Sequence, residues 1–366
     1  MSKKNNIIII IIFSIWVSSS CHAGWMSEFV NVLKDPNVQE PILDIGLDIL
    51  SNIIEEKLNK QNDLEKQLPE RLSLIPQSAD FVIIINVTKL LAIPEIQELI
   101  SEKFEKQPAQ KKTYEQLKIY SGFDPLKDIS NIILFSSGKV VDGQEILGGA
   151  IIEGKFDVDK IIKLIKEDKN TKKDVELTVI DGFNYVVPKN NKDGYGIFLD
   201  NQHVVIGNKI GVNAVKEVKK GKAKTIQANI DFLDIINKID SNAAVSGAGI
   251  LPQAFKDKCA KNPNAASLAK INTFCFDLNK DRNLVFNLNI EVDKKENVNN
   301  VMTQVNGYLA MIKMFAGQAG PEIAEAANML TATNTETTIK LSLDVPAAKV
   351  AEIKAKIEEK AKNKTK

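Results

Sequence analysis

The chain has 366 residues, of which 44% are hydrophobic and 26% charged, and its formal net charge is +1. This is the composition of a globular protein with enough apolar material for one or two packed cores. Because positive and negative charges nearly cancel, the sequence offers no basic excess with which to bind nucleic acid or an anionic membrane surface.

The start of the chain has the layout of a secretory signal peptide. Lys3 and Lys4 are followed by an apolar run from Ile7 to Val17 and then by small residues. That run is about half of the ~20 residues that a helix needs to cross a bilayer, so it is too short for a lasting anchor. Without Lys3 and Lys4 the 48 basic residues become 46 against 47 acidic ones, a net charge of −1. We therefore expect an exported protein, periplasmic or extracellular.

Two endings of the signal peptide stay open. Ala23 stands just before Gly24 and has a small residue two positions earlier, which suits ordinary cleavage of residues 1–23. Alternatively, Cys21 becomes the acylated first residue of a bacterial lipoprotein, although such sites usually carry an apolar residue where this chain has Ser18. The membrane is then contacted only through the leader or through a lipidated Cys21.

The chain beyond the leader contains two cysteines, Cys259 and Cys275. Exported proteins meet oxidising conditions, so a disulfide between these residues is one alternative. Two separate buried thiols are the other, because the spacing does not show whether the two Cβ atoms face each other.

Residues 24–70 are predicted to form an N-terminal helical segment. Apolar residues recur there at steps of three and four, at Leu43, Leu47, Leu50, Ile54 and Leu58. The helix is expected to begin near Pro41, since proline is tolerated in a first turn. It could pack on the body, serve as a partner-binding arm or lie on a membrane surface, and its mixed charge disfavours the last.

A first α+β unit is predicted over residues 71–226. Apolar β-branched runs predict strands, and apolar residues at helical spacing predict helices. The expected strands are residues 81–85, 129–135, 145–153, 175–180, 183–187, 195–199 and 203–206. The expected helices are residues 90–104, 113–120, 158–166 and 211–220. Asp181-Gly182 predicts a tight hairpin between two of the strands.

A second α+β unit with a C-terminal helix is predicted over residues 227–366. The expected strands are residues 243–248, 270–278, 283–292 and 337–345. The expected helices are residues 252–260, 297–315 and 322–330, and a last one from Pro346. Apolar and polar residues alternate strictly over residues 283–292, which predicts a sheet with one buried and one wet face.

Two stretches share a plan of strand, turn, strand, acidic turn and helix. They are residues 128–167 and 270–309. This similarity predicts an α+β protein of two related units, preceded by the N-terminal amphipathic helix. Each unit is expected to be an antiparallel sheet covered by helices on one face.

Three segments carry a resemblance to a known group. PQSADFVIIINVTKLLAIPEIQELI, SGFDPLKDISNIILFSSG and GGAIIEGKFDVDKIIKLI contain a strand, a helix, a Gly-Phe-Asp-Pro turn and a strand pair ending in Gly-Lys-Phe-Asp. In this order they resemble exported bacterial proteins of unknown function, the DUF3352-like group. The resemblance is best over residues 76–218, and it implies export but no catalytic residue.

Motifs for phosphate or calcium binding lack their essential residues. Gly149 to Lys155 has the spacing of a phosphate loop, but its middle is an apolar strand and Phe156 follows the lysine. Gly247-Ala248-Gly249 lacks the third glycine of a dinucleotide loop. Asp277 to Asn283 mimics half of a calcium loop with Arg282 at the glycine position, so we expect a hairpin turn.

Candidate acid, base and metal-binding groups are better explained as structural. His203 is the only histidine beyond the leader if cleavage follows Ala23, and a lone histidine cannot form a two-histidine metal site. Paired acids lie in turns and at helix starts, at Asp124, Asp128, Asp157 and Asp159. Capping of backbone N–H groups is their expected role.

The sequence therefore predicts an exported, non-catalytic envelope protein that works by binding or scaffolding. Its partner is an unknown envelope protein or ligand, and no catalytic residue, cofactor or metal site is assigned. Two alternatives stay open: a hydrolase that uses carboxylates in a groove between the units, and a carrier of a hydrophobic ligand. Two carboxylates within ~10 Å in a groove favour the hydrolase. An apolar groove favours binding or carriage.

Overall fold

The structure is a computed structural model. It describes residues 71–93, 96–97, 100–101, 104–105, 108–137, 147–167, 175–189, 194–240, 242–263, 265–280, 283–353 and 355. The leader with Cys21 and the predicted helix from Pro41 to Leu58 lie outside the described residues. Two compact units meet in sequence between Asn229 and Ile230. Each contains helices and an antiparallel sheet, so the chain has the α+β fold that the sequence predicts.

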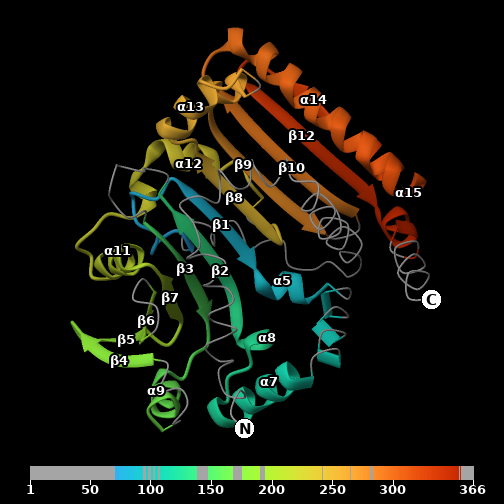
Figure 1. Ribbon diagram of the computed structural model, residues 1–366. Coiled ribbons are helices and arrows are strands. Elements are labelled where there is room, and N and C mark those ends of the chain that lie inside the picture. Colours follow the sequence, from blue (N-terminus) through green and yellow to red (C-terminus); the bar gives the residue numbers. More distant parts are fainter. Residues whose placement is uncertain are drawn as a thin grey trace. The chain divides into compact units, whose positions relative to one another are not determined.

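The sheet of the first unit is antiparallel throughout. In spatial order its strands are β1 (Phe81–Asn86), β2 (Ile129–Ser136), β3 (Gly148–Gly154), β7 (His203–Gly207), β6 (Tyr195–Phe198), β5 (Phe183–Pro188) and β4 (Val175–Ile180) (Figure 1). Asp181 and Gly182 join β4 to β5 with φ angles of 55° and 82°. Positive φ at both central residues is the requirement of a tight hairpin turn, so the predicted hairpin is confirmed.

The helices of the first unit lie on both faces of its sheet. They are α5 (Val87–Leu91), α7 (Pro108–Ser121), α8 (Pro125–Asp128), α9 (Val158–Glu167) and α11 (Lys209–Lys219). Ile162 of α9 packs against Val204 of β7. On the opposite face, the Tyr185 hydroxyl lies 3.3 Å from the Asn213 side chain of α11.

The sequence predicts that helices cover only one face of this sheet, and for the first unit that prediction is wrong. Ile151 of β3 and Val205 of β7 are fully buried, and their neighbours Ile152 and Val204 on the other face are also buried. Strands that bury both faces need a covering element on each side.

The strands of the second unit also pair antiparallel. In spatial order its strands are β8 (Val245–Ile250), β9 (Ile271–Lys280), β10 (Asn283–Val292), β12 (Thr338–Pro346) and β11 (Thr331–Asn334). Its helices are α12 (Ile230–Ile236), α13 (Gln253–Ala260), α14 (Lys295–Ala319) and α15 (Pro321–Asn328), and residues 347–353 are helical. Figure 1 shows α14 running beside β12 and β10.

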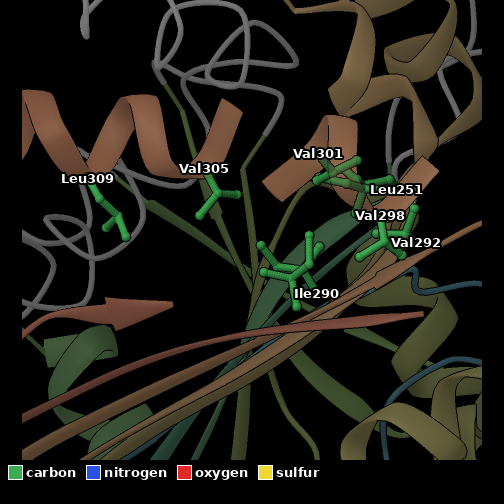
Figure 2. Packing of buried hydrophobic residues seen from close by; sticks show 9 residues of the cluster. Leu251, Ile290, Val292, Val298, Val301, Val305 and Leu309 are labelled. Carbon is green, nitrogen blue, oxygen red and sulfur yellow. The ribbon is translucent and has the colours of Figure 1, made fainter. Parts of the chain in front are cut away.

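Helix α14 packs on one face of this sheet through a stripe of buried residues. Val298, Val301, Val305 and Leu309 recur at steps of three and four and contact the cluster that contains Ile290 (Figure 2). This spacing places them on one side of the helix. Within the described part of the chain, no helix is long and apolar enough to cross a membrane.

Candidate functional site

The candidate binding site lies on the apolar face of the second unit, where β9 and β10 run side by side. The antiparallel register places Phe274 opposite Ile290 and Phe276 opposite Leu288. Because side chains alternate along a strand, these four residues share one face of the sheet. The alternation predicted for residues 283–292 thus places Leu288 and Ile290 on the expected face.

An open groove follows this face. Its volume is about 410 Å³, which lies in the range of small-molecule sites. The described residues that line it are all apolar: Leu251, Ile271, Phe274, Phe276, Phe286, Leu288 and Ile290. Ile290 is buried at 9% exposure, whereas Phe286 and Leu288 are only half-buried. Among the described residues, α14 covers the Ile290 end of this face, and the Phe286 and Leu288 positions are only partly covered.

Two glycines of β8 lie opposite the two aromatic residues that β9 contributes to the groove. Gly247 is opposite Phe276 and Gly249 is opposite Phe274 in the β8–β9 pairing. Glycine has no side chain to raise above the sheet, so the aromatic rings of β9 stand next to a low strip of backbone. The Gly247-Ala248-Gly249 run is part of strand β8.

Lys256 of α13 contacts Asn272, the residue that follows Ile271 of the groove lining. The Lys256 ammonium of α13 donates a 2.6 Å hydrogen bond to the Asn272 side chain, and the Asn272 carbonyl accepts from the Leu251 N–H. Burial lowers the pKa of Lys256, and the field of Asp293 partly opposes this shift. The apolar strand pattern was detectable from the sequence, but nothing in the sequence indicated Lys256.

The opposite face of the same sheet is polar. The Asn287 amide donates to Asp277 at 3.0 Å, and the Ser342 hydroxyl lies 3.3 Å from the Asn287 oxygen. Lys238 forms an ion pair of 2.7 Å with Glu291. Burial raises the pKa of Asp277, and the Asn287 hydrogen bond partly offsets the effect. These carboxylates face away from the groove, because Asp277 and Glu291 alternate with its lining residues.

The described polar residues of the calcium-like motif each bond to a different partner. Asp277 pairs with Asn287, Asn279 donates to Asp240, and Asn283 donates to Asp344. The stretch belongs to the β9–β10 hairpin, as predicted. Within the described residues, no group of three or more His, Cys, Asp or Glu side chains is placed to hold a metal ion.

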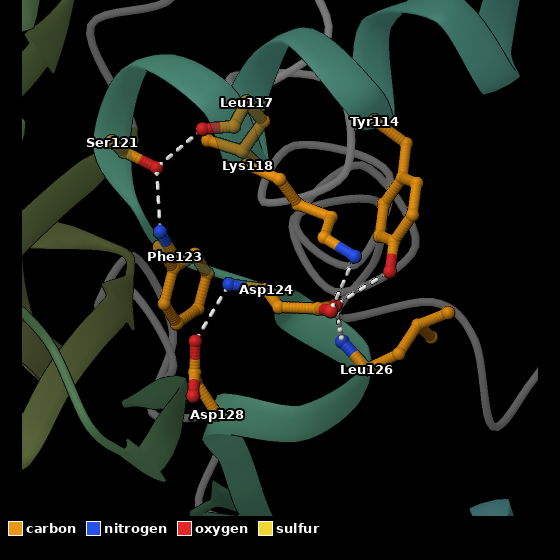
Figure 3. A network of polar contacts seen from close by, with 8 residues as sticks. All are labelled: Tyr114, Leu117, Lys118, Ser121, Phe123, Asp124, Leu126 and Asp128. Atoms are coloured by element: carbon orange, nitrogen blue, oxygen red, sulfur yellow. Dashed lines mark hydrogen bonds and ion pairs between the residues drawn. The ribbon is translucent and has the colours of Figure 1, made fainter.

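The Asp124 carboxylate organises the turn between α7 and β2 (Figure 3). It accepts hydrogen bonds from the Leu126 N–H at 3.2 Å and from the Tyr114 hydroxyl at 2.5 Å, and Lys118 lies 2.8 Å away. Burial acts to raise the pKa of Asp124, but Lys118 and the other donors hold it below its usual value. Burial and Asp124 raise the pKa of Tyr114.

The remaining predicted caps also have structural roles. Asp128 accepts from the Asp124 N–H at 2.6 Å, and Asp157 accepts from the Lys160 N–H at 3.0 Å at the start of α9. A carboxylate that accepts from the N–H groups of a first turn stabilises the helix start. The capping role is confirmed for Asp124, Asp128 and Asp157, and Asp159 lies in the first turn of α9.

His203 belongs to a turn rather than to a cleft. Its Nδ1 atom lies 2.8 Å from Asp200, which also accepts from the Gln202 N–H and pairs with Lys219. Although burial opposes the shift, Lys219 and the other donors lower the pKa of Asp200 to about 2. These bonds close the turn between β6 and β7, which agrees with the structural role predicted for His203.

Cys259 and Cys275 are both buried free thiols, so the disulfide alternative is not what the structure contains. Cys275 lies on the polar face of the sheet, where the Asn289 amide is 3.8 Å from its sulfur. Cys259 lies on α13, which packs against the short helix Ala266–Lys270. Burial raises the pKa of both thiols and so disfavours the reactive thiolate.

The sequence and fold were also compared with known proteins. No family model, curated protein or solved structure matches the chain. The resemblance to the DUF3352-like group therefore stays a prediction, and the function must be argued from the site itself.

Proposed function

We propose that the chain is an exported, non-catalytic protein that works by binding, with the groove of the second unit as its binding site. The observation that carries this proposal is the lining of the groove, since every described residue that lines it is apolar. An open apolar groove is a typical surface for binding a hydrophobic ligand or partner. Carriage of a hydrophobic ligand is one form of the same activity.

The hydrolase alternative receives no support from the described residues. Asp124 and Asp157 cap helices, Asp200 is paired with a lysine, and Asp277 lies on the polar sheet face. Glycosidase-type chemistry needs two carboxylates that face one substrate from opposite sides. None of the described residues that line the groove of the second unit is a carboxylate, so this groove does not support the hydrolase alternative.

Binding of anilinonaphthalene sulfonate to the purified protein tests the site. We expect saturable binding that Phe276→Gln and Leu288→Gln each weaken at least tenfold, because both place a polar group in the apolar lining. Met311→Gln is the matched control, since Met311 is 48% exposed on α14 and does not line the groove. Equal binding by all variants would exclude the groove as the site.

Export rests on the leader and is tested by the intact mass of protein taken from its native envelope. A first residue of Gly24 supports cleavage after Ala23, and an acylated Cys21 supports lipidation. A mass that still includes residues 1–23 contradicts both.

We also propose that the two units are related by duplication. The first has the order β1, α5 to α8, β2, β3, α9, β7, α11, with β4 to β6 inserted before β7. The second has the order β8, α13, β9, β10, α14, β12 and the helix of residues 347–353. Superposition of the two units in an experimental structure tests this, and mismatched strand directions would contradict it.

A further inference from the structure

We propose that strand β4 of the first unit pairs antiparallel with β4 of a second copy of the chain. β4 is the last strand in the spatial order of the sheet, and among the described residues it pairs only with β5 (Figure 1). An edge strand presents a row of unpaired N–H and C=O groups, and these groups bind an extended chain. β4 belongs to the first unit and the groove to the second, so this proposal does not depend on the binding function.

The hairpin turn determines which backbone groups of β4 point outward. Ile180 and Phe183 flank the two-residue turn, and residues in this position form a hydrogen-bonded pair. Hydrogen-bonded and non-hydrogen-bonded pairs alternate from there along the hairpin. Every second residue of β4 therefore has its N–H and C=O directed away from β5: Val175, Leu177 and Val179. Pro188, which has no N–H, stands opposite Val175, as this alternation allows.

β4 carries none of the features that usually protect an edge strand. Natural edge strands are blocked by Pro, by Lys or by a β-bulge. The sequence VELTVI contains neither Pro nor Lys, and its pairing with β5 shows no register shift. Val179 and Ile180 are apolar residues that are 68% and 44% exposed. A strand of this kind pairs readily with another chain.

The sequence of β4 is complementary to itself, which favours a second copy as the partner. All outward groups of both strands are used when a two-fold axis passes through Leu177, so that Val175 of each copy stands opposite Val179 of the other. The exposed Val179 side chain then has an apolar neighbour on the same sheet face. Glu176, the only charged residue of the strand, falls opposite Thr178. No like charges oppose each other in this register.

Sedimentation equilibrium of the processed full chain tests the dimer. A strand of six residues buries less surface than a standard interface, so we expect a weak, concentration-dependent dimer. Val179→Pro removes one outward N–H from each copy and should weaken association at least about tenfold. Val179→Lys places a charge on the edge and should have a similar effect. Val179→Thr keeps the N–H and the preference for strand, so it should change the association constant by less than about threefold.

Disulfide trapping tests the register. The Cα atoms of a hydrogen-bonded pair are about 5.5 Å apart, which suits a disulfide, so Leu177→Cys should give a covalent dimer on oxidation. Val179→Cys is the matched control. Val179 is more exposed than Leu177, but its two copies are separated by four residues along the pairing, roughly 14 Å, which is too far to bridge. Cys259 and Cys275 are buried and compete little with the new thiol.

Each part of the proposal has a result that would overturn it. A chain that stays monomeric at every concentration, including one that binds an extended peptide of another protein, contradicts pairing between copies. A dimer that Val179→Lys leaves unchanged contradicts the role of β4. Equal trapping of Leu177→Cys and Val179→Cys contradicts the axis at Leu177. Urea unfolding shows whether each variant is folded, and if Val179→Pro is not, Val179→Lys decides.

Discussion

Alanine replacements at two neighbouring groove positions test whether the centre of the apolar face is open. Ile290 and Leu288 lie two residues apart on β10 and have the same number of side-chain carbon atoms. Ile290 is 9% exposed and belongs to the cluster under α14, whereas Leu288 is half-buried at the edge of that cluster. The two substitutions therefore remove the same number of atoms from different environments.

The expected costs differ because only one substitution leaves an enclosed cavity. Ile290→Ala should lower the free energy of unfolding by about 3 kcal/mol, within the range for buried aliphatic residues. Leu288→Ala removes about three methylene equivalents that are half-exposed already, so about 1 kcal/mol is expected.

Urea unfolding followed by far-ultraviolet circular dichroism measures both costs. Since a chain with two units need not unfold in one step, the comparison uses the transition that Ile290→Ala shifts. Hydrogen exchange of the β10 amides gives an independent measure of the local free energy. A cost for Leu288→Ala equal to that for Ile290→Ala would show a closed core and refute the open groove.

Three further predictions concern polar groups. Asp124→Ala should lower the free energy of unfolding by about 2 kcal/mol, and Asp124→Asn should lower it by less, because the amide keeps an acceptor for the helix cap. Chemical denaturation measures both costs. Equal costs would contradict the capping role. The pKa of Asp200 is lowered to about 2 from 3.8, so its stabilising effect is present above pH 3.8 and is lost as the pH falls through 2. Urea midpoints of the wild type and Asp200→Asn should therefore differ at pH 7 and converge near pH 2, and a constant difference would exclude the ion pair with Lys219. Cys259 and Cys275 should react slowly with Ellman's reagent in the folded protein and give two thiols after denaturation without reductant, whereas no thiol would indicate a disulfide.

Local patterns in the sequence were enough to predict most strands. Residues 283–292 and 175–180 form strands with the predicted bounds, because alternation or a β-branched run flanked by turn residues favours extended backbone. Asp181-Gly182 forms the predicted hairpin, since only a few residue types tolerate two positive φ angles.

Helix α12 and strand β11 were not predicted, because tertiary packing rather than a local sequence pattern stabilises them. Helix α12 is short, and it depends on the burial of Phe232, Ile235 and Ile236 against the sheet. Strand β11, Thr331–Asn334, has few apolar residues and gains its backbone partners from β12. Such elements are stabilised by distant residues, so a local pattern does not indicate them.

Part of the candidate site could likewise be predicted from the sequence, and part depends on tertiary packing. Period-two alternation determined that Phe286, Leu288 and Ile290 share an apolar face, because successive side chains of a strand point to opposite sides. Only the tertiary structure decided that α14 covers Ile290 and that Phe286 and Leu288 stay half-buried. Which part of the sheet face a helix covers depends on where that helix packs, and contacts between residues far apart in the chain determine this.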